Sequence, residues 1–170
     1  MNKQLIPCLY LHSEKAVTGF GQRNLFGDGN VETLAKFYGD NGADELLVFD
    51  FSSADAEHDR AIGKIRDICQ VSEIPVIAAG NIKRMEDVQR ILYSGAKRVI
   101  LNFSKPDSAE MMAKAAERFG KEKVAVSLDD FDGLFKHQHL IEDNCSQLIF
   151  MHRLDLNSVV AVTDIPCVIV

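Results

Sequence analysis

Short apolar runs alternate with polar segments of helical period along most of the chain, and residues 74–102 show this pattern most clearly. An apolar run at 76–79 ends at Gly80-Asn81, a segment of helical period follows, and a second apolar run begins shortly after Gly95. This order predicts a strand, a helix that stops at the glycine, and a second strand parallel to the first. Parallel strands joined in this way are covered by helices and carry their sites at their carboxyl ends.

The same alternation begins near residue 5 and weakens after Asp130. It predicts strands at 5–11, 46–51, 76–79, 99–101, 123–128, 147–151 and 166–170. It predicts helices at 31–38, around 62–69, around 88–92, at 106–119, around 135–142 and at 157–163. Residues 12–30 are rich in glycine and are predicted to form one long polar loop.

These elements predict an α/β fold with parallel strands in one domain, 1–170. The expected architecture is a (β/α)8-type barrel that is incomplete, with about seven strands, and a flavodoxin-like sheet is the alternative. The segment 131–170 is expected to be degenerate or truncated. Its last strand ends on Val-Ile-Val with no helix to cover it, and such an apolar strand predicts self-association.

Composition narrows the classes of function. The chain is 46% hydrophobic and 26% charged, as expected for a globular protein. Its net charge of −6 disfavours binding to nucleic acid, and no apolar run approaches the roughly 20 residues that span a membrane. The four cysteines form no Cys-x-x-Cys pair, so neither a zinc site nor redox chemistry is indicated, and a cytoplasmic location is expected.

No metal or cofactor is expected. Asp129, Asp130 and Asp132 precede Gly133, but their spacing is not that of a calcium loop. His137 and His139 alternate, which predicts one solvated face of a strand rather than a metal site.

Polar residues at the predicted strand ends are the candidate site. A carboxylate there can act as an acid or base, and glycine lets backbone N–H groups approach a phosphate closely. The alternative for each is structural: a carboxylate that caps a turn, or a plain strand-to-helix turn at Gly80-Asn81. The candidates for phosphate or substrate binding are Asp50, Gly80, Asn81, Asn102 and Ser104, and the candidate catalytic residue is Asp129.

Several motifs occur in the order of a known family. They are LIPCLYL at 5–11, LAKFY at 34–38, GADELLVFD at 42–50, GNI at 80–82, MEDV at 85–88, GAKRVILN at 95–102 and VSLD at 126–129. Over residues 4–130 the chain resembles the cyclase subunit of imidazole glycerol phosphate synthase and the related isomerase of histidine biosynthesis. The resemblance implies an eight-stranded βα barrel. It also implies a lyase that cyclises a bis-phosphorylated aminoimidazole ribonucleotide, with ammonia from a glutaminase subunit.

The resemblance also implies two catalytic aspartates, at the ends of the first and fifth strands. Asp129 keeps the second position, but Tyr10 replaces the expected aspartate, and Thr18 replaces a lysine expected in the first loop. A phenol, with a reference pKa of about 10, is a poor substitute for a carboxylate base at neutral pH. We therefore expect cyclase activity to be impaired or lost.

The phosphate sites of the family are matched only in part. Gly80 and Asn102 follow the pattern, Asn81 and Phe103 depart from it, and the second phosphate site needs a strand beyond the seven predicted. Three classes of function stay open: a residual cyclase, a non-catalytic module that binds a sugar phosphate or a partner protein, and a fragment of a longer barrel. The expected partners are a phosphorylated small molecule, a glutaminase subunit and a second copy of the chain.

Overall fold

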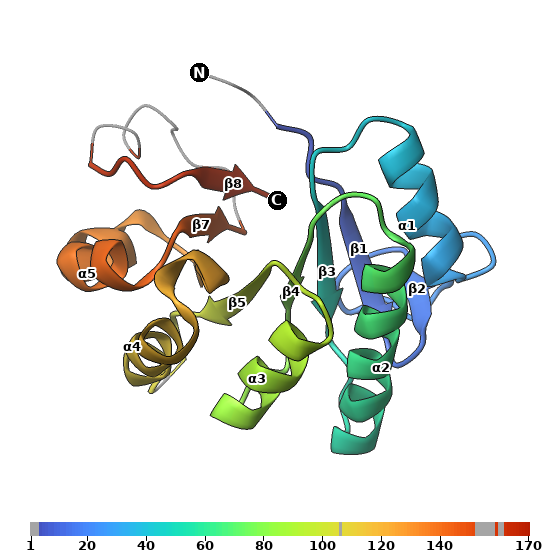
Figure 1. The fold of residues 1–170 in the computed structure, drawn as a ribbon, viewed down its shortest axis with the longest axis horizontal. Helices are drawn as coiled ribbons and strands as arrows, with labels where there is room; N and C mark the ends of the chain where they lie inside the picture. The colour runs from blue at the N-terminus through green and yellow to red at the C-terminus, as the bar shows by residue number, and fades with distance from the viewer. Residues whose placement is uncertain (1–3, 106, 152–158, 160–161) are drawn as a thin grey trace. The chain divides into compact units, whose positions relative to one another are not determined.

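The computed structural model describes residues 4–105, 107–151, 159 and 162–170 of the chain (Figure 1). The chain forms two compact units, Met1–Lys97 (unit 1) and Arg98–Val170 (unit 2), and each is described by itself. The prediction that the chain is one domain stays a prediction.

Unit 1 is a sheet of three parallel strands with one antiparallel strand at its edge. Its elements are β1 (Cys8–His12), β2 (Lys15–Val17), α1 (Val31–Asp40), β3 (Leu46–Asp50), α2 (Asp55–Val71), β4 (Val76–Ala79) and α3 (Met85–Tyr93). The strands lie in the order β2-β1-β3-β4, and β1, β3 and β4 are parallel. Because β1, β3 and β4 follow chain order, unit 1 differs from a flavodoxin-like sheet, in which the first strand lies between the second and third.

The prediction that residues 12–30 form one long polar loop is wrong in part. β2 forms inside it and pairs with β1, so that Tyr10 lies opposite Val17, and an isolated bridge joins Val17 to Leu25. Three residues are too few to show the alternation that identifies a strand in sequence.

The two faces of the unit 1 sheet differ in character. Leu11 and Asp50 are partners in the register between β1 and β3, and Asp50 contacts a side chain of α2, so this face is covered by helix. The opposite face carries Tyr10, Phe49 and Ala79, which are aligned across β1, β3 and β4. Side chains on both faces of β4 and nearly all of those of β3 are buried, as the continuous apolar runs predicted, whereas Cys8, Tyr10 and His12 of β1 are only half-buried.

Unit 2 is a sheet of four parallel strands. Its elements are β5 (Arg98–Asn102), α4 (Ser108–Phe119), the 3-10 turn η1 (Lys121–Lys123), β6 (Val124–Leu128), α5 (Phe131–Asn144), β7 (Gln147–Phe150) and β8 (Cys167–Ile169). The strands lie in the order β5-β6-β7-β8. Most of the helix predicted at 157–163 falls outside the described residues.

Helix α5 corrects two predictions. It is longer than the predicted 135–142, and it contains His137 and His139, which therefore do not share the face of a strand. The backbone departs from helical angles at His137 (φ −123°, ψ 19°), so the helix is kinked there. Asp130 begins the helix, because its Oδ1 accepts a hydrogen bond from the Gly133 N–H at 2.9 Å.

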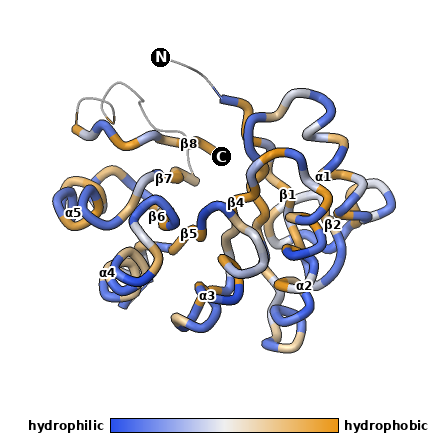
Figure 2. The backbone as a smooth tube through the Cα atoms, in the orientation of Figure 1, coloured by the Kyte–Doolittle hydropathy of each residue, from blue (hydrophilic) through white to orange (hydrophobic). Residues whose placement is uncertain are grey.

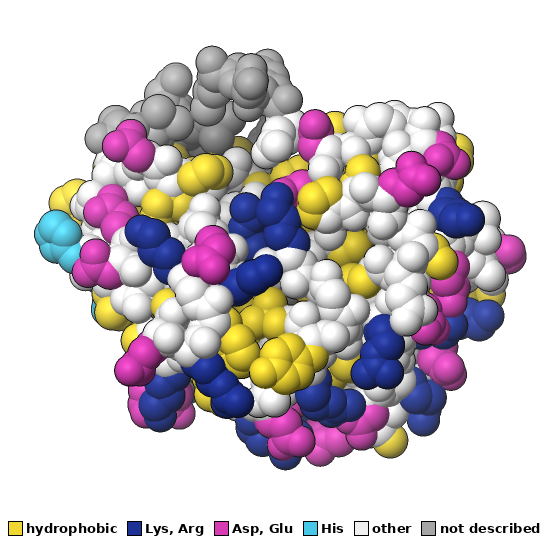
Figure 3. Space-filling model, in the orientation of Figure 1, with side chains coloured by type: hydrophobic (Ala, Val, Ile, Leu, Met, Phe, Trp, Pro, Cys, Tyr) yellow, Lys and Arg dark blue, Asp and Glu magenta, His cyan; other side chains and the backbone are white. Residues whose placement is uncertain are grey.

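The predicted α/β class with parallel strands is confirmed. The described residues contain three parallel strands in unit 1 and four in unit 2, joined by helices and each set in chain order, as in an incomplete (β/α)8-type barrel. Hydrophilic and hydrophobic segments alternate along the helices (Figure 2). On the face drawn in Figure 3, Lys and Arg side chains lie among Asp and Glu rather than in one patch. Among the described residues, no helix is both long and apolar enough to cross a membrane.

Candidate functional site

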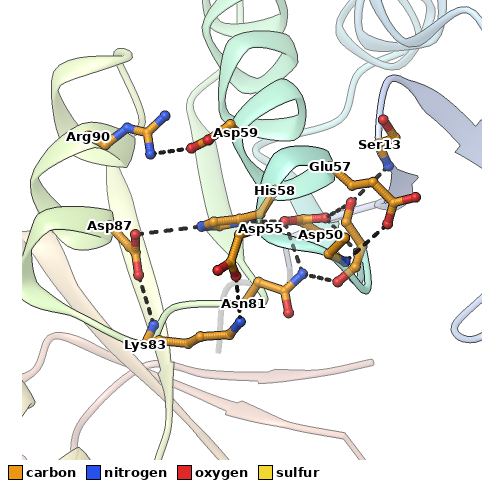
Figure 4. A network of polar contacts seen from close by, with 12 residues as sticks. Ser13, Asp50, Asp55, Glu57, His58, Asp59, Asn81, Lys83, Asp87 and Arg90 are labelled. Carbon is orange, nitrogen blue, oxygen red and sulfur yellow. Dashed lines mark hydrogen bonds and ion pairs between the residues drawn. The ribbon is translucent and has the colours of Figure 1, made fainter.

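The strand ends of unit 1 carry a polar network that begins with the exposed first turn of α2 and is buried at Asp50 and His58 (Figure 4). Glu57 Oε2 accepts hydrogen bonds from the backbone N–H groups of Ser53 (3.0 Å) and Ala54 (3.2 Å), and from the Ser53 hydroxyl. These bonds from Ala54 and Ser53 lower the pKa of Glu57. They also fix the start of α2, so that His58, in the next position, points back toward the end of β3.

Asp50, the last residue of β3, is the centre of this network. Its side chain is almost fully buried, and Oδ1 accepts hydrogen bonds from the N–H (2.9 Å) and hydroxyl (2.6 Å) of Ser52. Its Oδ2 lies 2.6 Å from His58 Nδ1 and 3.3 Å from Asn81 Nδ2. Ser52 in turn accepts a hydrogen bond from the Ser13 N–H at 2.8 Å. The network therefore joins the segments that follow β1, β3 and β4.

His58 lies between two carboxylates (Figure 4). On the side away from Asp50, its Nε2 is 3.8 Å from Asp87 Oδ1, and both atoms are buried without a hydrogen-bond partner. Asp87 Oδ2 accepts the backbone N–H groups of Lys83 and Arg84, each at 3.0 Å, and so caps the start of α3.

The segment after β4 is shaped by a close backbone approach. Gly80 has φ +97°, and a Cβ at this position would lie 1.6 Å from the Asp50 carbonyl oxygen. Asn81 also has a positive φ (53°), and its side chain donates to the Ser52 carbonyl as well as to Asp50. Both residues therefore have structural roles in this turn, and their predicted role in anion binding stays a prediction.

Tyr10 and Thr18 line a shared recess of unit 1. The recess has a volume of about 70 Å³, and Cys8, Phe26 and Tyr38 also line it. Burial raises the pKa of Tyr10, and the neighbouring Cys8 thiol raises it further. Burial likewise raises the pKa of Cys8 to about 11. Both groups therefore stay protonated at neutral pH.

An aromatic cluster lies near the same strand ends. The Phe20 ring centroid is 5.3 Å from that of Phe49 and 5.6 Å from that of Phe51, and the His12 ring centroid is also 5.6 Å from that of Phe51. Phe20 is 62% exposed, although it is a large apolar side chain. The ends of β1 and β3 therefore carry aromatic rings as well as the polar network.

Unit 2 brings its three candidate residues together. Ser104 donates its N–H to Asn102 Oδ1 at 2.9 Å and its hydroxyl to Asp129 Oδ2 at 2.5 Å. The Ser108 hydroxyl at the start of α4 donates to the Asn102 carbonyl at 2.5 Å. The ends of β5 and β6 therefore share one polar cluster, which contains the predicted Asn102, Ser104 and Asp129.

The predicted residues thus form two groups. Asp50, Gly80, Asn81 and Tyr10 belong to unit 1, and the cluster around Asp129 belongs to unit 2. A single site made from both groups stays a prediction. Among the described residues, no group of three or more His, Cys, Asp or Glu is placed to hold a metal ion.

His58 and Asp87 are not among the site residues predicted from the sequence. A signal for His58 was present, because His58 recurs with Ile62 and Ile65 at helical spacing and therefore lies on the buried face of α2. Asp87 lies three residues after Arg84, where an acidic side chain commonly caps the first turn of a helix. Neither signal shows that the two side chains face each other.

Comparisons with known proteins agree with the fold. A family model described as histidine biosynthesis protein matches residues 4–161. The chain is 33% identical over 131 residues to imidazole glycerol phosphate synthase subunit HisF of Staphylococcus epidermidis, covering 77% of this chain and 52% of the relative. It is 33% identical over 129 residues to the HisF subunit of Methanocaldococcus jannaschii (76% and 47% covered). It is 36% identical over 132 residues to that of Tolumonas auensis (76% and 50%). The chain spans about half the length of the curated relatives it matches.

Proposed function

Because the chain belongs to the histidine biosynthesis protein family, we propose that it is a divergent relative of the HisF subunit with impaired or no cyclase activity. In this proposal it binds a phosphorylated small molecule through the polar residues at its strand ends. A chain that retained activity would be a lyase that uses ammonia. The family's place in biosynthesis supports a cytoplasmic location.

Tyr10 is the observation that carries the proposal. The family resemblance implies a carboxylate at this position, and Tyr10 has a phenol whose pKa is raised by burial and by Cys8. A group that holds its proton at neutral pH cannot act there as the general base. Thr18, in the position of the expected lysine, lines the same recess, so both replacements lie together.

The unit 2 cluster supports binding of a phosphate. Asn102 and Ser104 lie at the end of β5, close to the first turn of α4. The N-terminus of a helix carries partial positive charge and unpaired N–H groups, which favour an anion. Asp129 is held by the Ser104 hydroxyl and is the remaining carboxylate of the proposed acid/base pair.

A cyclase assay with ammonia and the family substrate tests the loss of activity. We expect no turnover by the natural chain, and partial recovery in the double variant Tyr10→Asp, Thr18→Lys. Tyr10→Phe is the matched control, because it removes the hydroxyl and keeps the ring. Turnover by the natural chain at the rate of a HisF subunit would show the proposal to be wrong.

Titration with inorganic phosphate, followed by amide NMR shifts, tests binding separately. We expect the amides of Asn102 and Ser104 and, in unit 1, those of Gly80 and Asn81 to move with phosphate concentration. Chloride at equal ionic strength is the control. Resonances that do not move at these four residues would reject phosphate binding.

Binding of a partner protein is the second candidate function. Phe20, Leu25 and Phe26, all between β2 and α1, are 62%, 50% and 45% exposed, and large exposed apolar side chains are typical of interaction surfaces. A glutaminase subunit and a second copy of the chain are the proposed partners. Light scattering tests self-association, and a monomer at high protein concentration would exclude it.

A further inference from the structure

We propose that His58 is a positioning residue whose protonation sets how tightly the segment after β4 is held against α2. The proposal starts from two buried atoms that face each other without a bond, His58 Nε2 and Asp87 Oδ1. They are 3.8 Å apart, and His58 and Asp87 are only 7% and 1% exposed. The proposal concerns unit 1 alone and does not depend on the proposed function.

The hydrogen-bonding capacity of the two partners explains the missing bond. An ionised carboxylate can only accept hydrogen bonds, whereas a neutral imidazole has one N–H and one bare nitrogen. Because Nδ1 lies 2.6 Å from Asp50 Oδ2, the single N–H of a neutral ring is committed to Asp50. The bare Nε2 then faces the Asp87 oxygen lone pairs, and no hydrogen bond forms between them.

Protonation changes this arrangement. The imidazolium has an N–H on both nitrogens, so it can bond to Asp50 and Asp87 at once. The distance from Nε2 to Oδ1 must then shorten from 3.8 Å to about 3.0 Å, the usual length of such a bond. Protonation therefore draws the first turn of α3 toward α2 by a fraction of an ångström.

The contacts of Asp87 carry this shift to the segment after β4. Its Oδ2 holds the backbone N–H groups of Lys83 and Arg84, so these amides move with the carboxylate. Asn81, in the same segment, is bound to Asp50, which is the other partner of His58. His58 is thus linked from both sides to residues 81–84.

The charges around His58 are mostly acidic. Asp50 faces it from β3, Asp87 from α3, and Asp55 interacts with it from the first turn of α2. Two cations lie at the edge of this group, with Lys83 bonded to Asp55 at 3.0 Å and Arg84 Nη2 3.6 Å from Asp87 Oδ1. Both cations are more than half exposed, so solvent weakens their effect on the buried ring.

NMR of the free protein tests the proposal. The protonation of the His58 ring is followed by its own carbon and nitrogen shifts from pH 4.5 to 8.5, alongside the amide shifts of Asn81, Lys83 and Arg84. We expect the ring and these amides to titrate with the same midpoint. A ring that keeps one protonation state across this range, or amides that stay still while it titrates, would overturn the proposal.

Three variants separate this role from a merely structural one. In His58→Gln the three amides should lose their pH response. In His12→Asn, which removes the other histidine near these strand ends, they should keep it. Asp87→Asn keeps an oxygen for the caps of Lys83 and Arg84 but presents an N–H to His58 Nε2, which favours the neutral ring. There we expect the midpoint shared by the ring and the amides to move to lower pH. A response that persists in His58→Gln, or an unchanged midpoint in Asp87→Asn, contradicts the proposal.

Discussion

Gly80→Ala offers a sharp test of the geometry of unit 1. The glycine has φ +97°, and an added Cβ would lie 1.6 Å from the carbonyl oxygen of Asp50, where real Cβ atoms do not come closer than about 3.0 Å. The contact atom is backbone, so no side-chain rotation can relieve the overlap. β3 and β4 would have to move apart at their carboxyl ends, and the bonds of Asp50 to Ser52 and Asn81 would be disturbed.

The size of the effect can be estimated from two contributions. A positive φ costs an alanine about 1–2 kcal/mol. Forcing one extra methyl group into a packed position typically costs a further 1–3 kcal/mol. We therefore expect Gly80→Ala to lower the free energy of unfolding by about 2–5 kcal/mol, a large share of the stability of an ordinary domain.

Gly42→Ala is the matched control. Gly42 also has a positive φ (+84°), at the C-terminal end of α1, but a Cβ there meets no atom within 4 Å. Its cost should be only the backbone contribution of about 1–2 kcal/mol. Urea unfolding followed by circular dichroism measures both variants. A Gly80→Ala variant no less stable than Gly42→Ala would show that β3 and β4 do not approach each other as closely as described.

Three further predictions concern side chains. Burial raises the pKa of Cys145 to about 12 from 9.0, so the unfolded state loses its proton first and stability falls as pH rises from about 9. Cys145→Ala should make the fall in unfolding free energy between pH 9 and 11 shallower, and an unchanged slope would contradict this. Backbone bonds from Ala54 and Ser53 lower the pKa of Glu57, so its stabilisation is present above pH 4.5 and is lost as pH falls through the lowered value. Glu57→Gln should flatten the unfolding free energy measured from pH 6 to pH 3. Ser104→Ala removes the hydroxyl that bonds Asp129 and should cost about 0.5–1.5 kcal/mol in urea unfolding, with no effect if that bond is absent in solution.

The parallel strands were predictable because strands buried on both faces are continuously apolar. The runs at 46–51 and 76–79 gave β3 and β4 nearly to the residue. Helix α5 was predicted too short, because Gly133 and two histidines interrupt its hydrophobic pattern of helical period. The alternation of His137 and His139 was in addition read as the period of a strand. Helix α5 nevertheless forms over its full length, because tertiary packing stabilises a helix more than its local sequence pattern does.

The candidate site was predictable only in its positions. Parallel strands place their carboxyl ends at one edge, so a sequence can indicate which residues lie there, and the cluster of Asn102, Ser104 and Asp129 follows from this rule. The sequence does not indicate which of these side chains form hydrogen bonds with one another. Asp50 and Asp87 are far apart in sequence, and only the packing of α2 beside α3 brings them to the two sides of one imidazole.

Asp50 shows why a polar strand end does not by itself indicate a ligand. A carboxylate has about four sites that can accept a hydrogen bond. In this chain four are occupied, by the N–H and hydroxyl of Ser52, by His58 and by Asn81. A phosphate or a substrate at Asp50 would have to displace one of these bonds and leave a buried donor unpaired, which costs about 1–3 kcal/mol. Asn102 is exposed, so we expect a phosphorylated ligand to make its first contact in unit 2 rather than at Asp50.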